Sequence, residues 1–491
     1  MDRIASVLLD FPPAGGLADN AQYHQAALSH SQKVEKLSTQ SEFKEHAPTL
    51  LDHIHPVDHS ISYLSLLIAA RESLPQTDVL TKTTMFLSTF DSRQLRYAGK
   101  ALSTVLGWLT SGELFPASVA VDLLTTALLR LDPTGSMLTS HHVSLVKFAY
   151  TTDNIEPALP LIEKNIVFYP GGKGMNESRP RCDMELPPAA YLTTESGLTK
   201  PVTSNDVLQY DLFRGLCFIQ RRSWRQAFDA LERVVTYPAR DSYSCSKIMI
   251  EAYNKWILVG LLLDGKTPTL PATTAPGPQK AYAALCKPYQ AIGRAFEQPT
   301  AEALTAEFES VGAQFFSEEN NLSLVRLVLQ HCQRWQVLNL RRVYTKISLE
   351  QLRARTQSAE TAAPLASVAE MEALVRQMID EGMLAGVIER DGDGDGDGGR
   401  AYLTFLSPEG ELSETEFAHR MMRTAQRLKA LEPLVRATNE RLGTSQDYVR
   451  YLVAQQKREK DAAARGDYGG GSSFMNQVED EDLMTGIMEG F

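Results

Sequence analysis

The stretch from Leu322 to Leu406 constrains the fold most, because its pattern changes from helical to extended in a fixed order. Apolar residues recur at spacings of three and four in two segments, as on the buried face of a helix: 324–332 and 368–379. An extended run, Tyr344 to Leu349, lies between them. Two runs with β-branched and aromatic residues follow and predict a hairpin: 384–389 and 401–406. The expected order is helix, strand, helix, helix, strand and strand, which is the outline of a winged-helix module.

Two residues support the helix boundaries in this module. Ser348 is placed to cap a helix that starts at Leu349, because a serine hydroxyl accepts a hydrogen bond from a free N–H of the first turn. Gly382 stands where the helix of 368–379 should stop, and it supplies the left-handed conformation that helix ends favour. That last helix is the one that a DNA-binding winged helix inserts into a groove.

The tip of the predicted hairpin is an Asp-Gly repeat that invites comparison with a calcium-binding loop. Asp391, Asp393 and Asp395 occupy loop positions one, three and five, and Gly396 occupies position six. Position twelve is Tyr402, where such a loop requires a bidentate glutamate. The repeat is therefore interpreted as a flexible, solvated turn, and we expect no metal there.

The residues before this module are predominantly helical in pattern and contain pairs of helices. The clearest pair covers 208–218 and 227–235, where Gly215 and Ala227 occupy small-residue positions of a tetratricopeptide-type repeat. Small residues there let the two helices approach closely. Less regular matches to the same repeat precede this pair in the sequence. We expect an all-α, TPR-like solenoid of helical repeats, interrupted by a polar inserted loop at 171–205.

Motifs for catalysis or cofactor binding are missing from the sequence. The five cysteines contain no CxxC pair, and the glycine-rich 171–174 lacks the Lys-Ser or Lys-Thr of a phosphate-binding loop. The densest group of metal-ligand types is His53, His55, Asp58 and His59, but the Ser and Asp that a zinc isopeptidase needs after its His-x-His pair are absent. We expect no enzyme, no cofactor and no metal, although dispersed catalytic residues would leave no such pattern.

The charge distribution argues against nucleic acid as the main partner. The formal net charge is -11, and residues 466–491 hold six acids and no Lys or Arg. The helix that would enter a DNA groove, 368–382, carries four acids against Arg376 alone. A basic stretch lies upstream, between Arg334 and Arg355, and fits a solvated face or a protein contact.

Apolar runs in the chain are too short for membrane insertion or export. The run from Trp256 to Leu263 is shorter than a bilayer span, and the apolar part of the N-terminal segment is too short for a secretory signal. The unpaired cysteine pattern fits a reducing compartment. We expect the protein in the cytoplasm and nucleus, with no membrane partner.

Beyond the winged-helix stretch, apolar residues follow a heptad pattern that is typical of a helix with partner helices. The apolar seam positions are Phe417, Met421, Leu428, Leu431, Val435 and Leu442. Packing against the chain's own solenoid is the alternative. Pro433 should kink or end this helix, and a second helix is expected over 446–465. The tail, 466–491, is expected to be disordered, with apolar spacing near its end that permits a helix on a basic partner.

Helical repeats that lead into a winged helix and end in long helices are the plan of PCI-domain proteins, the scaffold subunits of the proteasome lid, the COP9 signalosome and a translation initiation complex. Within this group the chain most resembles the signalosome subunit 3 family, through blocks that include Ile250 to Val259 and Asn320 to Val325. The resemblance implies a non-catalytic scaffold subunit that supports cullin deneddylation through contacts with other signalosome subunits. It also implies that the isopeptidase chemistry belongs to a different, metal-bearing subunit.

The expected organisation has four regions: a helical-repeat solenoid over 1–315, the winged-helix module over 316–408, C-terminal helices over 412–465 and an acidic disordered tail over 466–491. Candidate partner-binding residues are Tyr402 and Phe405 in the hairpin, together with the six apolar seam residues. A two-stranded hairpin would leave 401–406 or its neighbour with unpaired backbone groups for another subunit's strand. The alternative is a PCI scaffold of another complex, in the proteasome lid, translation initiation or mRNA export, with nucleic-acid association.

Overall fold

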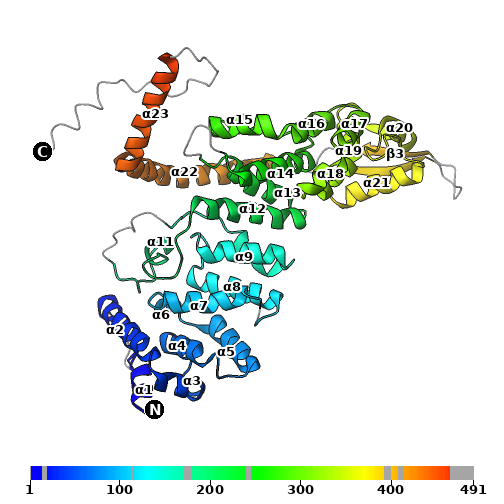
Figure 1. Cartoon of the computed structure of the whole chain (residues 1–491). Coiled ribbons are helices and arrows are strands. Elements are labelled where there is room, and N and C mark those ends of the chain that lie inside the picture. Colours follow the sequence, from blue (N-terminus) through cyan, green and yellow to red (C-terminus); the bar gives the residue numbers. More distant parts are fainter. Residues whose placement is uncertain are drawn as a thin grey trace. The chain divides into compact units, whose positions relative to one another are not determined.

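A computed structural model of the chain describes residues 2–13, 19–112, 114–170, 179–238, 245–391, 400–406 and 414–464 (Figure 1). The chain forms two compact units, Met1–Phe405 and Leu406–Phe491. Helices dominate both units, and the described residues contain one sheet, of three strands. Every helix in these ranges is too short or too polar to span a membrane.

The first unit begins with helices stacked so that neighbours in the chain are also neighbours in space (Figure 1). They are α1 (Asp2–Leu8), α2 (Asn20–Ser38), α3 (Ser41–His53), α4 (Ser60–Ala70), α5 (Gln76–Thr89), α6 (Ser92–Leu95), α7 (Gly99–Thr110), α8 (Ala117–Leu131), α9 (Ser140–Thr151), α10 (Leu159–Ile162) and α11 (Pro188–Tyr191). α4 is apolar on nearly every side, and it packs against α2, α3, α5 and α7. Tyr63, Leu64 and Leu67 are fully buried there, as expected for a core helix.

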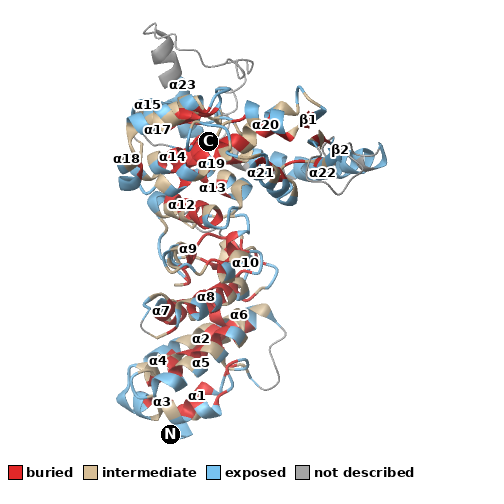
Figure 2. Ribbon diagram, turned by 90° about the vertical axis from the view of Figure 1, so that its right-hand side faces the viewer, coloured by how far each residue is buried: buried red, intermediate tan, exposed pale blue. Residues whose placement is uncertain are grey.

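The stack continues with α12 (Ser204–Gln220), α13 (Trp224–Val235), α14 (Lys247–Asp264), α15 (Pro276–Leu285), α16 (Lys287–Phe296), α17 (Glu302–Val311) and α18 (Ala313–Glu318). The predicted helix pair is confirmed as α12 and α13. A Cβ atom on Gly215 would lie 3.0 Å from Leu231 Cδ2, so the glycine lets these helices approach closely. Buried residues run through the stack (Figure 2), and most of the apolar ones belong to one large core.

The predicted inserted loop, 171–205, packs closely onto the helical stack where the structure describes it. Tyr191 of α11 is buried, and the Arg96 guanidinium lies over its ring, 3.6 Å from the centroid. Arg96 also donates a hydrogen bond to the carbonyl oxygen of Arg181 at 2.7 Å. The Pro and Gly content of the inserted segment predicted its lack of long helices. The packing of the segment on the stack was not predicted, because only a few apolar side chains hold it there.

The last part of the first unit contains the elements expected over 322–406, in the expected order: α19 (Leu322–Leu340), β1 (Lys346–Ser348), α20 (Leu349–Arg355), α21 (Val368–Asp380), β2 (Gly386–Asp391) and β3 (Arg400–Phe405). Ser348 Oγ accepts a hydrogen bond from the Gln351 N–H at 3.2 Å, as its predicted capping role requires. Gly382 follows α21 with a φ of 72°, which confirms the predicted left-handed helix end. The Asp-Gly hairpin tip, 392–399, lies outside the described residues.

β3 is the central strand of the antiparallel sheet, and β1 and β2 lie at its two edges. Tyr402 is paired with Ser348 of β1 on one side and with Glu389 of β2 on the other. The expected two-stranded hairpin is therefore part of a three-stranded sheet. Of the two hairpin strands, β2 has the unpaired edge. The sheet, α20 and α21 enclose a small core that is separate from the core of the stack: Val337, Ile347, Leu349, Leu352, Met371, Val375, Met378, Leu384, Leu403 and Phe405.

The second unit contains two helices, α22 (Glu414–Thr444) and α23 (Gln446–Ala464). α22 continues through Pro433, so of the two expected outcomes, a kink or a helix end, the helix end does not occur. Proline removes one N–H donor and crowds one carbonyl, and the remaining backbone bonds of a long helix can hold it together. The second helix begins at Gln446 as predicted. The acidic tail, 466–491, lies outside the described residues.

Candidate partner-binding surfaces

The predicted heptad residues on α22 form an exposed apolar stripe, which we call the α22 seam. Its five described side chains keep 53, 60, 64, 51 and 54% of their surface exposed, in the order Phe417, Met421, Leu428, Leu431 and Val435. Alternating spacings of four and three residues place them on one side of the helix. Leu442 follows the same spacing, but its side chain lies outside the description. A continuous exposed apolar surface of this kind marks an interaction site.

The apolar surface on α22 is large enough to drive association. Full burial of a large apolar side chain is worth about 1.5–3 kcal/mol, and about half of each seam side chain is still exposed. The five side chains together hold on the order of 4–8 kcal/mol, before the cost of ordering the partners is subtracted. α23 adds exposed apolar side chains at Tyr451, Leu452 and Val453.

The structure separates the two hairpin residues that the sequence grouped as partner contacts. Side chains alternate between the two faces of a strand, and on β3 Leu403 and Phe405 point inward. Phe405 is only 9% exposed and belongs to the small core, so its packing is internal. Tyr402 lies on the other face, where Lys346 Nζ is 5.1 Å from its ring centroid. Only Tyr402 is available to a partner.

β2 provides the open edge on the hairpin side of this sheet. Val387, near its start, is 46% exposed, and the strand pairs with β3 along its whole length on the opposite side. The unpaired N–H and C=O groups of an edge strand can bond to a strand from another chain. This edge is the surface that a β-addition contact would use.

Acidic residues pair with part of the basic stretch beside the sheet, at Arg334 and Lys346, and with Arg390 of β2. Arg334 Nη1 lies 2.5 Å from Glu381 Oε2, and Lys346 Nζ lies 2.6 Å from Glu389 Oε2. The hydrogen bond from Lys346 lowers the pKa of Glu389. Arg390 Nη2 lies 3.0 Å from Glu372 Oε1 of α21. A phosphate group that approaches these three cations would meet paired charges, which weakens the electrostatic attraction on which nucleic-acid binding depends.

Hydrogen bonds organise the loop that contains the candidate metal ligands. His59 Nδ1 lies 2.7 Å from the Phe11 carbonyl oxygen, and His55 Nδ1 lies 3.7 Å from Asp58 Oδ2. Across the part of the chain that the structure describes, no group of three His, Cys, Asp or Glu side chains could hold a metal ion. His59 therefore has a structural role, since it connects the segment after α1 to the start of α4.

Burial keeps the core cysteines in a poorly reactive form. It raises the pKa of Cys217 and Cys286 to about 12 and that of Cys332 to about 11. The thiolate is the nucleophile and the metal ligand, so these three thiols are unsuited to either role near neutral pH.

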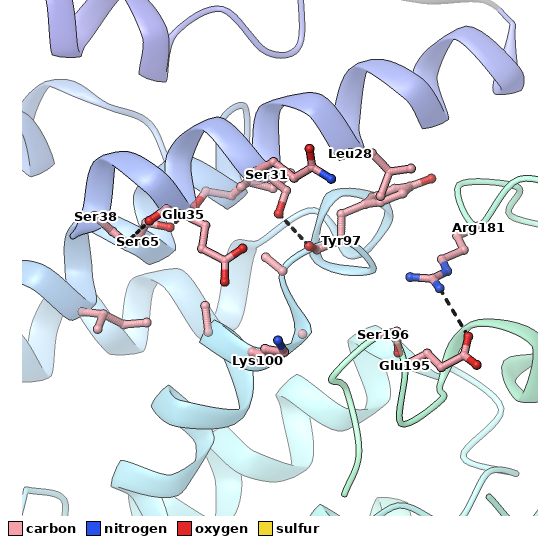
Figure 3. Close-up of a pocket in the computed structure, with 16 residues that line it drawn as sticks. Leu28, Ser31, Glu35, Ser38, Ser65, Tyr97, Lys100, Arg181, Glu195 and Ser196 are labelled. Carbon is pink, nitrogen blue, oxygen red and sulfur yellow. Dashed lines mark hydrogen bonds and ion pairs between the residues drawn. The ribbon is translucent and has the colours of Figure 1, made fainter. Parts of the chain in front are cut away.

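A pocket of about 300 Å³ lies between α2, the start of α7 and the inserted segment (Figure 3). Arg181 and Glu195 face each other at its mouth, with Nη2 and Oε2 4.0 Å apart. Ser31 Oγ donates a hydrogen bond to the Tyr97 carbonyl oxygen at 2.9 Å. The lining contains serines together with Glu35, Lys100 and Glu195, and no histidine or cysteine. No sequence pattern predicted this pocket, because the inserted segment forms part of its wall.

Comparison with known proteins agrees with the resemblance in the sequence. Residues 20–276 match the family model for the N-terminal helical repeats of COP9 signalosome complex subunit 3. The chain is 48% identical over 504 residues to COP9 signalosome complex subunit 3 of Neurospora crassa, with 99% of both chains covered. It is 26% identical over 450 residues to the protein of the same name from Emericella nidulans, with 88% of this chain and 89% of the relative covered.

Proposed function

This chain belongs to the family of COP9 signalosome complex subunit 3, and we propose that it is a non-catalytic scaffold subunit that supports cullin deneddylation by holding other signalosome subunits in place. The α22 seam is the observation that carries this proposal. Apolar side chains at heptad spacing are buried when partner helices pack against them, and here they are exposed. Helices from neighbouring subunits would bury the seam in a shared bundle.

We propose a second contact region at residues 316–408, which we assign as a PCI winged-helix module. The order of its elements and its separate core support this assignment. A strand from a neighbouring subunit would extend the sheet at β2, and Tyr402 would contact that neighbour from the outer face. Phe405 would act indirectly, because it supports β3 from within the core.

The remaining regions follow from the same proposal. Residues 1–315 form the solenoid, 412–465 provide the bundle helices, and 466–491 form an acidic tail. Five free cysteines fit a reducing compartment, so we propose that the protein works in the cytoplasm and nucleus.

A PCI scaffold with nucleic-acid association is the competing proposal. The ion pairs of Arg334, Lys346 and Arg390 argue against it, because paired cations release fewer counterions when a phosphate backbone binds. Titration of the purified chain with RNA and DNA at several salt concentrations separates the two. Binding that weakens steeply with salt would favour the competing proposal.

The scaffold role is tested by placing charge in the seam. Met421→Asp with Leu428→Asp should remove the tagged chain from a complex co-expressed with the other signalosome subunits, because burial of an unpaired carboxylate in a helix contact is costly. Circular dichroism should show helix content close to that of the unchanged protein.

Gln426→Asp with Ala430→Asp is the matched control. These neutral residues lie on the opposite side of α22, because each residue of a helix is rotated by about 100° from the last. Both are exposed, and the change in charge is the same as in the seam variant. The control should enter the complex normally. Normal entry of the seam variant would refute the bundle contact, and exclusion of both variants would show that α22 tolerates no added charge on either side.

A further inference from the structure

Between α14 and the junction of α18 with α19 lies a pocket of about 300 Å³ whose lining is rich in hydrogen-bond acceptors. We call it the acceptor pocket. It is lined by Lys247, Ile250, Glu251, Asn254, Glu318, Glu319, Asn320 and Asn321. Five of these eight residues come from the sequence blocks 250–259 and 320–325, which also carry the family resemblance. The fold thus brings together two segments that are far apart in the chain.

A chain of hydrogen bonds fixes the floor of the acceptor pocket. Tyr289 OH donates to Glu319 Oε2 at 2.6 Å and accepts from Asn321 Nδ2 at 2.7 Å. Asn254 Nδ2 donates to the same Glu319 oxygen at 3.4 Å. Because an ionised carboxylate only accepts, Asn254 must turn its NH₂ group toward Glu319, and Asn321 must turn its NH₂ group toward the Tyr289 oxygen. The network therefore determines the orientation of both amides.

These orientations leave the Oδ1 atoms of Asn254 and Asn321 without a hydrogen bond from any residue in the described ranges. The two residues are only 5% and 1% exposed. A buried acceptor without a donor costs about 1–3 kcal/mol, and native proteins keep few such atoms. Both asparagines line the acceptor pocket, so a donor group that enters it would lie beside them.

The rim of the pocket adds negative charge. Glu251, Glu318 and Glu319 line it against a single lysine, Lys247. Glu251 is paired with Lys255 at 3.0 Å, whereas the ion pairs of the described residues include neither Glu318 nor Glu319. Glu318 and Glu319 are therefore left without a basic partner in a pocket that also contains the two asparagines with unsatisfied oxygens.

We propose that the acceptor pocket binds an arginine side chain presented by a partner protein. A guanidinium group is planar, positively charged and carries five N–H donors with no acceptor, so it complements both the carboxylates and the amide oxygens. A metal ion fits less well, because the described residues hold no cluster of three acidic, histidine or cysteine ligands. Arginine binding by the acceptor pocket does not depend on whether the partner is a signalosome subunit.

The test uses the purified full-length chain and the synthetic peptide acetyl-Gly-Ser-Arg-Ser-Gly-amide. A second peptide carries citrulline in place of arginine, which keeps the shape of the side chain and removes its charge. Saturation-transfer NMR detects weak binding of such peptides. We expect transfer to the arginine side chain and a dissociation constant at least about tenfold weaker for the citrulline peptide.

Two double variants locate the binding. Glu318→Gln with Glu319→Gln removes the unpaired rim charges and keeps an oxygen that can accept from Tyr289, so it should abolish arginine binding. Glu302→Gln with Glu309→Gln removes the same charge from exposed positions of α17 outside the pocket, and should leave binding unchanged. Asn254→Ala tests the floor independently and should weaken binding.

Three results would overturn the proposal. Equal binding of the arginine and citrulline peptides would remove the role of charge. Equal loss in both double variants would show a general attraction to an acidic chain. Calorimetric binding of calcium chloride that is lost in Glu318→Gln with Glu319→Gln, without arginine binding, would assign the pocket to a metal ion.

Discussion

Gly265 directly follows the last residue of α14, and its surroundings leave no room for a side chain. It has a φ of 64°, and its N–H donates to the Leu261 carbonyl oxygen at 3.1 Å, as a left-handed helix end does. A Cβ atom there would lie 2.4 Å from Cδ2 and 2.5 Å from Cε3 of Trp335. Trp335 belongs to α19, so this contact connects the helical stack to the segment that carries the sheet.

Gly265→Ala should reduce the free energy of unfolding by about 2–5 kcal/mol. The left-handed conformation costs a residue with a Cβ atom roughly 1–2 kcal/mol. The indole ring or the end of α14 must also move by about 1 Å to restore an ordinary contact distance, and overpacking of this kind adds about 1–3 kcal/mol.

Gly382→Ala is the matched control for this substitution. Gly382 also follows a helix and has a φ of 72°, but no heavy atom lies within 4 Å of its Cβ position. Only the backbone cost of about 1–2 kcal/mol then applies. Urea unfolding of the full chain, followed by circular dichroism and tryptophan fluorescence, compares the two variants. Equal losses of stability would refute the assignment of a steric role to Trp335.

Two further predictions concern core packing and pH. Leu403→Ala should lower the free energy of unfolding by about 2–5 kcal/mol, because Leu403 is fully buried in the small core. Val387→Ala, on the exposed edge, should lower it by less than about 1 kcal/mol. Urea unfolding measures both changes. Burial lowers the pKa of His142 to about 3, so its stabilising contribution is complete above pH 6.5 and falls as the pH drops toward 3, by about 1.4 kcal/mol per pH unit. His142→Gln keeps an acceptor for the Thr139 N–H and should flatten the loss of stability between about pH 6 and 4; an unchanged pH profile would contradict this.

Local patterns predicted the elements of the sheet but not their arrangement. β-branched and aromatic residues identified β2 and β3, and the turn between them implied that they pair. The pairing of β3 with the short β1 joins Ser348 to Tyr402, which are far apart in the chain, and no local pattern specifies it. Because β1 pairs with the edge of β3 that β2 leaves open, β3 is the central strand.

The same limit explains the different outcomes for Tyr402 and Phe405. Alternation shows that they lie on opposite faces of β3, but it does not show which face the helices cover. α20 packs against β3 on the inward side, so Phe405 became a core residue. Pro433 does not end α22 for a related reason, because the many other backbone bonds of the 31-residue helix remain when one bond is lost.

The α22 seam and the acceptor pocket show why one kind of site can be predicted from sequence and the other cannot. A heptad lies within one helix, so spacing alone fixes which side chains share a face. The acceptor pocket takes residues from α14, the end of α18 and the connection to α19, and its character depends on Tyr289 of α16. Without Glu319 and Tyr289 as partners, the amides of Asn254 and Asn321 would have no preferred orientation. The chemistry of that pocket therefore exists only once the helices are stacked.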